Sequence, residues 1–178
     1  MNSASADPDA PPPDILLAWK TCLGGWKPVG PLTLVRSADR RMWCAGIWKH
    51  TLIPAIVAAH ARAAQPAQLV EYDAGIDLGA FEAGNRAQGA RFLDRFSRTT
   101  GDKAWRKYLR EYDLGRAPGH FVVCLGARAA RFHLPVRQVL ALALAVEARG
   151  AGIAFHSTDF AEMLLSLPSP DSLHLRAA

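Results

Sequence analysis

Two acidic residues, Glu71 and Asp73, stand two positions apart in the short alternating segment Leu69–Asp73. The alternation predicts a strand, in which residues i and i+2 point to the same side. Two carboxylates on one face can hold Mg²⁺, the usual cofactor of phosphodiester cleavage. We therefore predict Glu71 and Asp73 as metal ligands and catalytic residues. The alternative is the solvent-facing edge of a half-buried strand, because the segment completes no known metal motif.

Two short pieces pair a glycine with an arginine, Gly84-Asn85-Arg86 and Gly89-Ala90-Arg91. A glycine turn at a helix start can cradle a phosphate through backbone N–H groups, with the guanidinium as a second contact. This predicts Gly84 and Arg86 as nucleotide-binding residues. Arg86 would also offset charge that develops on the phosphoryl oxygens during catalysis. A simple loop is the alternative explanation.

His120 and Cys124 lie four residues apart in an apolar segment that we expect to be a strand, with His133 beyond it. Strand rise would separate His120 from Cys124 by about 13 Å, too far for a nucleophile and its base. Zinc would require a fourth ligand and a tighter arrangement. A buried cysteine and a capped histidine are therefore the favoured interpretation.

The excess positive charge is concentrated in residues 85–116, which hold nine bases and four acids, a net +5. The whole chain also carries +5, so the remaining residues sum to zero. Clustered bases favour a polyanionic partner, since attraction to DNA grows with the number of phosphates neutralised. A solvated outer face is the ordinary alternative.

The basic residues of the segment Asp102–Asp113 recur at helical spacing, as do its aromatic and aliphatic residues. We predict that one helix contacts DNA through its basic stripe, and that an aromatic ring stacks on unpaired bases. The predicted nucleic-acid-binding residues are Lys103, Trp105, Arg106, Lys107 and Arg110. An acidic protein surface is the alternative partner of the same helix.

Helical and strand-like segments alternate along the chain without a repeat. Expected strands are Leu32–Val35, Met42–Trp48, Leu69–Asp73, His120–Leu125 and Ile153–Phe155. Expected helices are 15–23, 54–64, a segment within 78–96, 102–113, 136–149 and 160–167. The pattern predicts an α/β fold with a mixed sheet flanked by helices.

The chain has 178 residues, half of them hydrophobic, which is enough for one globular domain. We predict a flexible tail over residues 1–13, a single α/β domain over 14–168 and an irregular tail over 169–178. The longest apolar run is too short to span a membrane, so no membrane insertion is expected. Three cysteines without a Cys-x-x-Cys pair favour a reducing, cytoplasmic compartment.

The run Trp26–Val35, the segment Met42–Trp48 and the helix start Ile53-Pro54-Ala55 resemble plasmid fertility-inhibition proteins of the oncogenic suppression (Osa) type. The resemblance implies a ParB/sulfiredoxin-like fold. It also implies a plasmid-encoded role in blocking conjugative DNA transfer at the coupling step of type IV secretion, with ATPase and DNase activity. Gly84-Asn85-Arg86 comes near the glycine-arginine turn of that superfamily but lacks its second basic residue.

Two hypotheses of function follow. In the first, the chain is a cytoplasmic inhibitor of conjugation that binds DNA and the type IV secretion coupling machinery. Whether it is an enzyme stays open, with Mg²⁺-dependent nuclease and ATPase activity as the reaction and Mg²⁺ and ATP as the cofactors. In the second, it is a non-enzymatic adaptor or immunity-type protein that binds an acidic protein partner.

Overall fold

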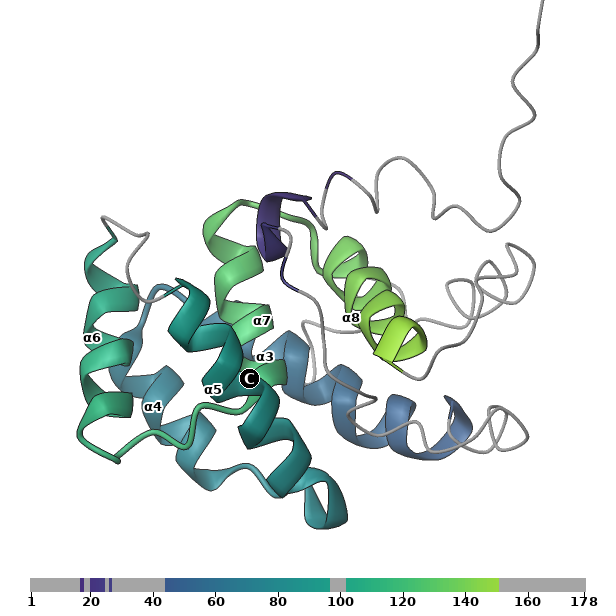
Figure 1. Ribbon diagram of the computed structural model, residues 1–178, viewed down its shortest axis with the longest axis horizontal. Helices are drawn as coiled ribbons and strands as arrows, with labels where there is room; N and C mark the ends of the chain where they lie inside the picture. Colours follow the sequence, from purple (N-terminus) through teal and green to yellow (C-terminus); the bar gives the residue numbers. More distant parts are fainter. Residues whose placement is uncertain (1–16, 18–19, 25, 27–43, 97–101, 151–178) are drawn as a thin grey trace, which may run out of the picture.

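Every regular element that the structure describes is a helix (Figure 1). The structure is a computed structural model, and it describes residues 17, 20–24, 26, 44–96 and 102–150. The predicted α/β fold with a mixed, ParB/sulfiredoxin-like sheet is therefore wrong, since the described parts of three expected strands fall in helices or, for His120, at a helix N-cap. The other two, Leu32–Val35 and Ile153–Phe155, lie outside the described residues.

The helices follow one another with short connections. In chain order they are the π-helix η2 (Cys44–Leu52), α3 (Ile53–Arg62), α4 (Pro66–Gly75), the 3₁₀-helix η3 (Gly79–Phe81), α5 (Glu82–Phe96), α6 (Lys103–Asp113), α7 (Phe121–Arg131) and α8 (Val136–Gly150). Residues 20–23 are also helical. Proline at the start of α3 and of α4 suits the first helical turn, where its missing N–H leaves no bond unmade.

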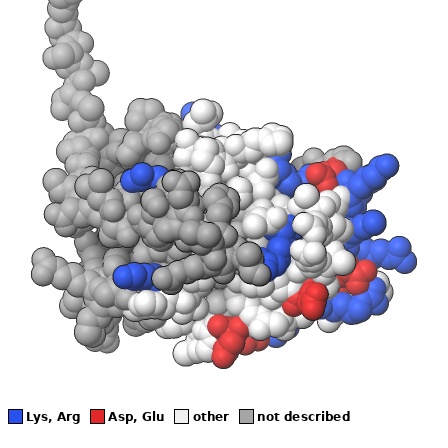
Figure 2. Space-filling view, turned by 180° about the vertical axis from the view of Figure 1, so that it is seen from behind, with Lys and Arg blue, Asp and Glu red and all other residues white. Residues whose placement is uncertain are grey.

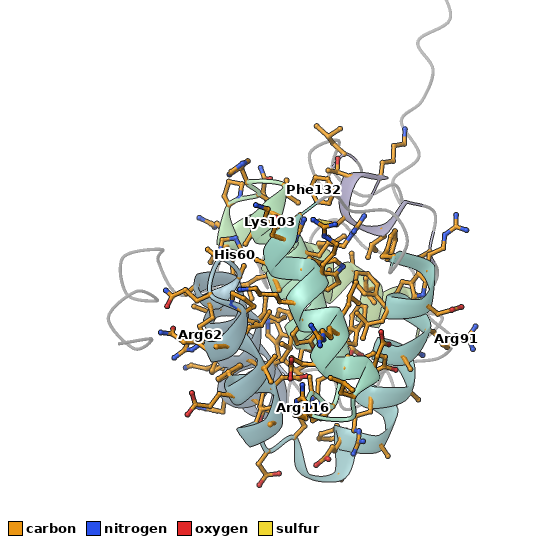
Figure 3. The ribbon with its side chains drawn as sticks, turned by 90° about the vertical axis from the view of Figure 1, so that its left-hand side faces the viewer. His60, Arg62, Arg91, Lys103, Arg116 and Phe132 are labelled. Atoms are coloured by element: carbon orange, nitrogen blue, oxygen red, sulfur yellow. The ribbon has the colours of Figure 1, made fainter. Side chains whose placement is uncertain are left out.

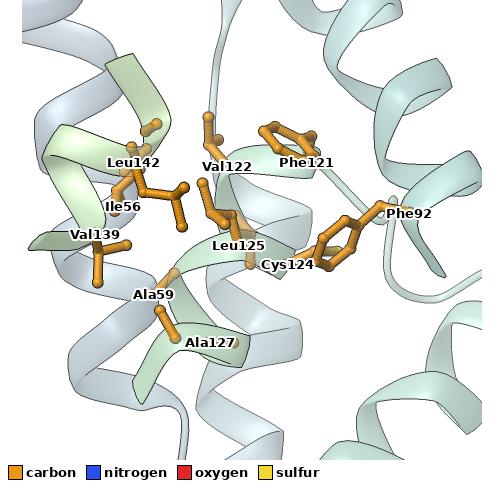
Figure 4. Close-up of a cluster of buried hydrophobic side chains, with 14 of the residues drawn as sticks. Ile56, Ala59, Phe92, Phe121, Val122, Cys124, Leu125, Ala127, Val139 and Leu142 are labelled. Atoms are coloured by element: carbon orange, nitrogen blue, oxygen red, sulfur yellow. The ribbon is translucent and has the colours of Figure 1, made fainter. Parts of the chain in front are cut away.

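Helix α7 lies at the centre of the fold, with Phe121 to Ala129 all buried. It packs against α3, α5 and α8, while α4 packs against α3 and α6 (Figure 1). Figure 4 shows apolar side chains gathered where α3, α7 and α8 meet, among them Ile56, Leu125 and Val139. The same core continues to Phe92 of α5, so the helices enclose one contiguous hydrophobic cluster.

Three segments that were expected to be strands are helical for identifiable reasons. Leu69–Asp73 lies in α4, where the apparent alternation is too short to distinguish a strand from a helix. His120 caps α7, which contains the rest of the expected strand His120–Leu125. That helix is buried on all sides, so it shows no polar stripe that would reveal its period. The described part of Met42–Trp48 lies in η2.

Several helix predictions are confirmed. The segments expected at 54–64, 102–113 and 136–149 correspond to α3, α6 and α8, and α5 lies within 78–96. The predicted helix 160–167, both tails and residues 15, 16, 18 and 19 of the predicted helix 15–23 fall outside the described residues, while residues 17 and 20–23 are helical. The predicted domain limits at 14 and 168 fall there too and stay a prediction. Among the described residues, no helix is long and apolar enough to cross a membrane.

Candidate functional site

The buried side chain of Asp73, on α4, accepts several hydrogen bonds. Its carboxylate has no solvent exposure. Oδ2 accepts hydrogen bonds from the Tyr108 hydroxyl at 2.7 Å and from the backbone N–H of Gly119 at 2.8 Å. Oδ1 accepts from the backbone N–H of His120 at 3.2 Å and lies 2.9 Å from Nδ1 of its imidazole. We call Asp73, Tyr108, Gly119, His120 and Cys124 the Asp73 cluster.

The cluster caps the N-terminus of α7. The first amides of a helix have no partner within it, and the positive end of the helix dipole attracts a carboxylate. The side chain of His120, at the N-cap position, makes no capping hydrogen bond. Two neighbouring helices supply the acceptors instead, because Asp73 of α4 receives the N–H of His120 and Asn85 Oδ1 of α5 receives the N–H of Val122 at 3.1 Å.

Gly119 meets two demands that only glycine satisfies. Its φ of +75° lies in the left-handed region. A Cβ added there would lie 2.5 Å from the ring of Tyr112, and a Cβ on Gly89 would lie 1.7 Å from the carbonyl oxygen of Gly119. Helix α5 therefore approaches the backbone of the α6–α7 connection directly. Gly89-Ala90-Arg91 is the middle of a helix, not a phosphate-binding turn.

The chemistry of the cluster is that of a structural anchor. The pKa of Tyr108 is raised well above its usual value, mainly by burial and to a smaller extent by the nearby Cys124 and Asp73. Its hydroxyl therefore stays protonated and remains a hydrogen-bond donor. The pKa of Cys124 is also raised, mainly by burial and to a smaller extent by the charge of Asp73. The Sγ atom of Cys124 lies 3.6 Å from the Tyr108 oxygen. A buried, protonated thiol is a poor nucleophile. His120 Nε2 is buried and has no hydrogen-bond partner among the described residues.

The structure separates the two acids that were predicted to share a strand face. Residues two apart on a helix project about 200° apart, so Glu71 is exposed while Asp73 is buried. Gly84 and Arg86 lie within α5, both exposed, and Arg86 forms an ion pair with Glu82 at 3.6 Å. Sequence reasoning missed the residue between them, Asn85, which is fully buried. No periodicity of α5 marks Asn85 as a cap for a distant helix.

The predicted nucleic-acid-binding residues divide between two sides of α6. The ring of Trp105 is buried and stacked on Tyr108, with 5.4 Å between the ring centroids, so it faces the core. The exposed members are Lys103, Arg106, Lys107 and Arg110, which we call the α6 basic face. Figure 3 looks onto α6, with Lys103 near one end of the helix and Arg116 just beyond the other.

Helix α6 is attached to the interior at two points. Its N-cap residue Asp102 accepts a hydrogen bond from the backbone N–H of Trp105 at 3.0 Å and pairs with Arg131 of α7 at 2.9 Å. Half a helix further on, the hydroxyl of Tyr108 donates to Asp73 of α4. These contacts, with the buried Leu109, fix the orientation of α6 and of its exposed side.

The described residues contain no group of three or more His, Cys, Asp or Glu side chains that could hold a metal ion. Asp73 is already occupied by hydrogen bonds, and no second carboxylate joins it in the interactions above. The expectation of Mg²⁺ and ATP as cofactors, with Glu71, Asp73, Gly84 and Arg86 as their ligands, therefore stays a prediction. Its original basis, a shared strand face and a phosphate-binding turn, is absent from the described helices.

In its described part the chain is an all-helical protein with a buried polar anchor and an exposed basic helix. It belongs to the UreF family of urease accessory proteins, which it matches over residues 36–154, more than half of its length. No curated protein and no solved structure was found to match the chain.

Membership in the UreF family corrects several expectations. The resemblance to Osa-type fertility-inhibition proteins is wrong, because the family that matches is UreF and the described fold is helical. The match to the UreF family also overturns the expected block of conjugation, nuclease activity, and DNA and type IV secretion machinery as partners, including the DNA partner that the basic stripe suggested. The alternative of a non-enzymatic adaptor or immunity-type protein that binds an acidic partner receives no specific support from the family match.

Proposed function

We propose that this chain is a urease accessory protein that acts in the insertion of nickel into urease, in an assembly with the accessory proteins UreD and UreG. One observation carries the proposal, namely the match to the UreF family over residues 36–154, which includes η2 through α8. Nickel is the cargo of this process. The proposal assigns no nickel ligand to the described residues, where no suitable group of side chains occurs.

The geometry supports a role in holding other proteins. The Asp73 cluster ties α4, α6 and α7 together, and residues of that cluster point inward, away from any partner. A preformed helical surface loses little conformational entropy when it binds, which favours a scaffold for assembly. We infer a cytoplasmic location, in keeping with the free, buried thiols of Cys22 and Cys124.

The test is activation of urease in cells that lack their own UreF. Urease, UreD and UreG from the organism that supplies this chain are expressed with and without it, at equal levels of each protein. We expect urease activity and bound nickel per urease to rise only when the chain is present. Equal nickel content in the two strains would contradict the proposal, whereas rescue in the presence of the chain supports it.

A further inference from the structure

The outer side of α6 carries four positive charges that form no ion pair with the described residues. Lys103, Arg106, Lys107 and Arg110 fall within an arc of about 100° on the helix, and all four are exposed. In Figure 2 the Lys and Arg side chains gather at the right-hand edge, which is the α6 end of the molecule in Figure 1. Some Asp and Glu side chains lie among them in the same view.

Two of the acids near the α6 basic face are paired with other bases, whereas Asp113, at the end of α6, is exposed. Asp102 forms an ion pair with Arg131 of α7, and Glu111 forms an ion pair with Arg116. None of the ion pairs found among the described residues includes Lys103, Arg106, Lys107 or Arg110. Bases three and four positions apart on a helix repel one another. A surface of opposite charge would therefore relieve a repulsion that the free protein retains.

The face is also held in place before any partner arrives. Trp105, Tyr108 and Leu109 are buried beneath it, and the bonds Tyr108–Asp73 and Asp102–Arg131 attach α6 to two other helices. A rigid charged surface orients a partner at low entropic cost and accelerates the encounter.

We propose that the α6 basic face binds an Asp- and Glu-rich surface of a protein partner in the urease-activating assembly. This inference rests on the proposed function. A protein fits the face better than a nucleic acid does, for two reasons. The aromatic rings of α6 that could stack on bases, Trp105 and Tyr108, are buried. Four charges spaced over about 10 Å of one helix also match an acidic patch more closely than an extended phosphate backbone.

The test compares two charge reversals of equal size. The double variant Arg106→Glu/Lys107→Glu alters the α6 basic face. Lys20→Glu/Lys49→Glu makes the same change in net charge at exposed residues of segments that lie away from α6 in Figure 1. Binding of the purified full chain to UreD, to UreG and to the two together is measured at several salt concentrations, with circular dichroism as a check on folding. We expect the α6 variant to bind at least about tenfold more weakly and with a shallower salt dependence, and the control to bind as the wild type does.

Two results would overturn the inference while leaving the proposed function intact. One is binding of the α6 variant with wild-type affinity and salt dependence. The other is tight binding of the wild type to duplex DNA that also displaces UreD or UreG, which would assign the face to nucleic acid. A wild type that activates no urease and binds neither accessory protein contradicts the proposed function itself, so the two failures are distinguishable.

Discussion

At the scale of single residues, Asp73 joins three helices that are distant in sequence. Its partners Tyr108, Gly119 and His120 lie 35, 46 and 47 positions away. Burying a carboxylate is costly unless hydrogen bonds replace its water, and the four contacts of Asp73 provide that replacement. The hydrogen bonds of Asp73 thus offset the cost of burying its charge, and they fix the arrangement of α4, α6 and α7.

Replacing Asp73 by Asn tests this role against a matched change on the same helix. The new amide NH₂ would face at least one donor, since both oxygens of Asp73 accept from N–H or O–H groups. We expect Asp73→Asn to lower the free energy of unfolding by about 2–4 kcal/mol. Glu71→Gln, at an exposed residue, should change it by less than about 0.5 kcal/mol. Urea denaturation of the two variants and the wild type measures both values.

A small and equal effect of Asp73→Asn and Glu71→Gln would contradict this assignment. It would mean that the two acids are equivalent, as expected of the paired strand-edge carboxylates that the sequence pattern suggested.

Residue types alone directed attention to Asp73, His120 and Cys124 but could not reveal how they meet. The strand assumption placed His120 about 13 Å from Cys124, whereas on α7 the two lie one helical turn apart and both contact groups of the Asp73 cluster. Helical spacing places Asn85 on the buried side of α5, seven residues before Phe92, but it does not reveal its partner, a backbone amide 37 positions away. Contacts between residues so far apart in the sequence cannot be predicted from the local spacing of hydrophobic and polar residues.

At the scale of elements, a helix can be predicted from the sequence when one of its sides is exposed and the other is buried. Helix α6 has one buried and one charged side, together with an Asp at its N-cap, so its period and start were both evident. Helix α7 is buried on every side, and its start, Phe-Val-Val-Cys-Leu, has the β-branched and aromatic residues of a buried strand. The sequence of this central, fully buried helix therefore resembles that of a buried strand in an α/β fold. This resemblance explains why the predicted fold class was wrong.

The N-cap of α6 leads to a prediction about pH. Burial by itself raises the pKa of Asp102, but the backbone N–H of Trp105 and the charge of Arg131 together lower it below its usual value. A carboxyl whose pKa is lower in the folded protein stabilises the fold above its unfolded pKa of about 3.9. That contribution is lost as the pH falls through the folded pKa. The side chain is 38% exposed, so solvent screening keeps the effect modest.

We expect Asp102→Asn to be less stable than the wild type at pH 7 and equally stable once the wild-type carboxyl is protonated. Asn keeps a good N-cap, so the difference isolates the charge. Asp113→Asn, at the exposed C-terminal end of α6, is the control and should be neutral or slightly stabilising, since an acid is unfavourable there. Thermal denaturation across the acid range measures these differences. A stability difference for Asp102→Asn that does not change with pH would contradict the prediction.

At the scale of the whole molecule, α7 connects the start of the described chain to the core. Arg128 donates from Nε to the carbonyl oxygen of Cys22 at 2.7 Å, and its guanidinium lies 3.9 Å from the ring centroid of Phe96. Trp26 stacks on Phe121 with 5.1 Å between the ring centroids. The contacts of Arg128 with Cys22 and of Trp26 with Phe121 join residues about a hundred positions apart, which favours cooperative unfolding of the described part as one unit.

The reactivity of two free cysteines in different helical segments can test whether the described part unfolds as one unit. Cys22 lies in the early helical segment and Cys124 in α7, and both are fully buried. Burial raises the pKa of Cys22 to about 12, although the charge of Arg128 opposes this, and burial also raises the pKa of Cys124. Neither thiol is appreciably ionised at neutral pH, so alkylation of the folded protein requires both exposure and loss of that environment.

In a Cys44→Ala variant, which leaves only these two thiols, we expect iodoacetamide to label Cys22 and Cys124 slowly and at the same rate in the native protein. The reason is that each becomes reactive only when the shared core opens, and a single opening exposes both. In urea above the unfolding midpoint, both should react at once. Mass spectrometry of the labelled peptides over time gives the two rates separately. Labelling of Cys22 much faster than Cys124 would show that the segment around Cys22 detaches while α7 stays packed, which would contradict a single cooperative unit that includes both.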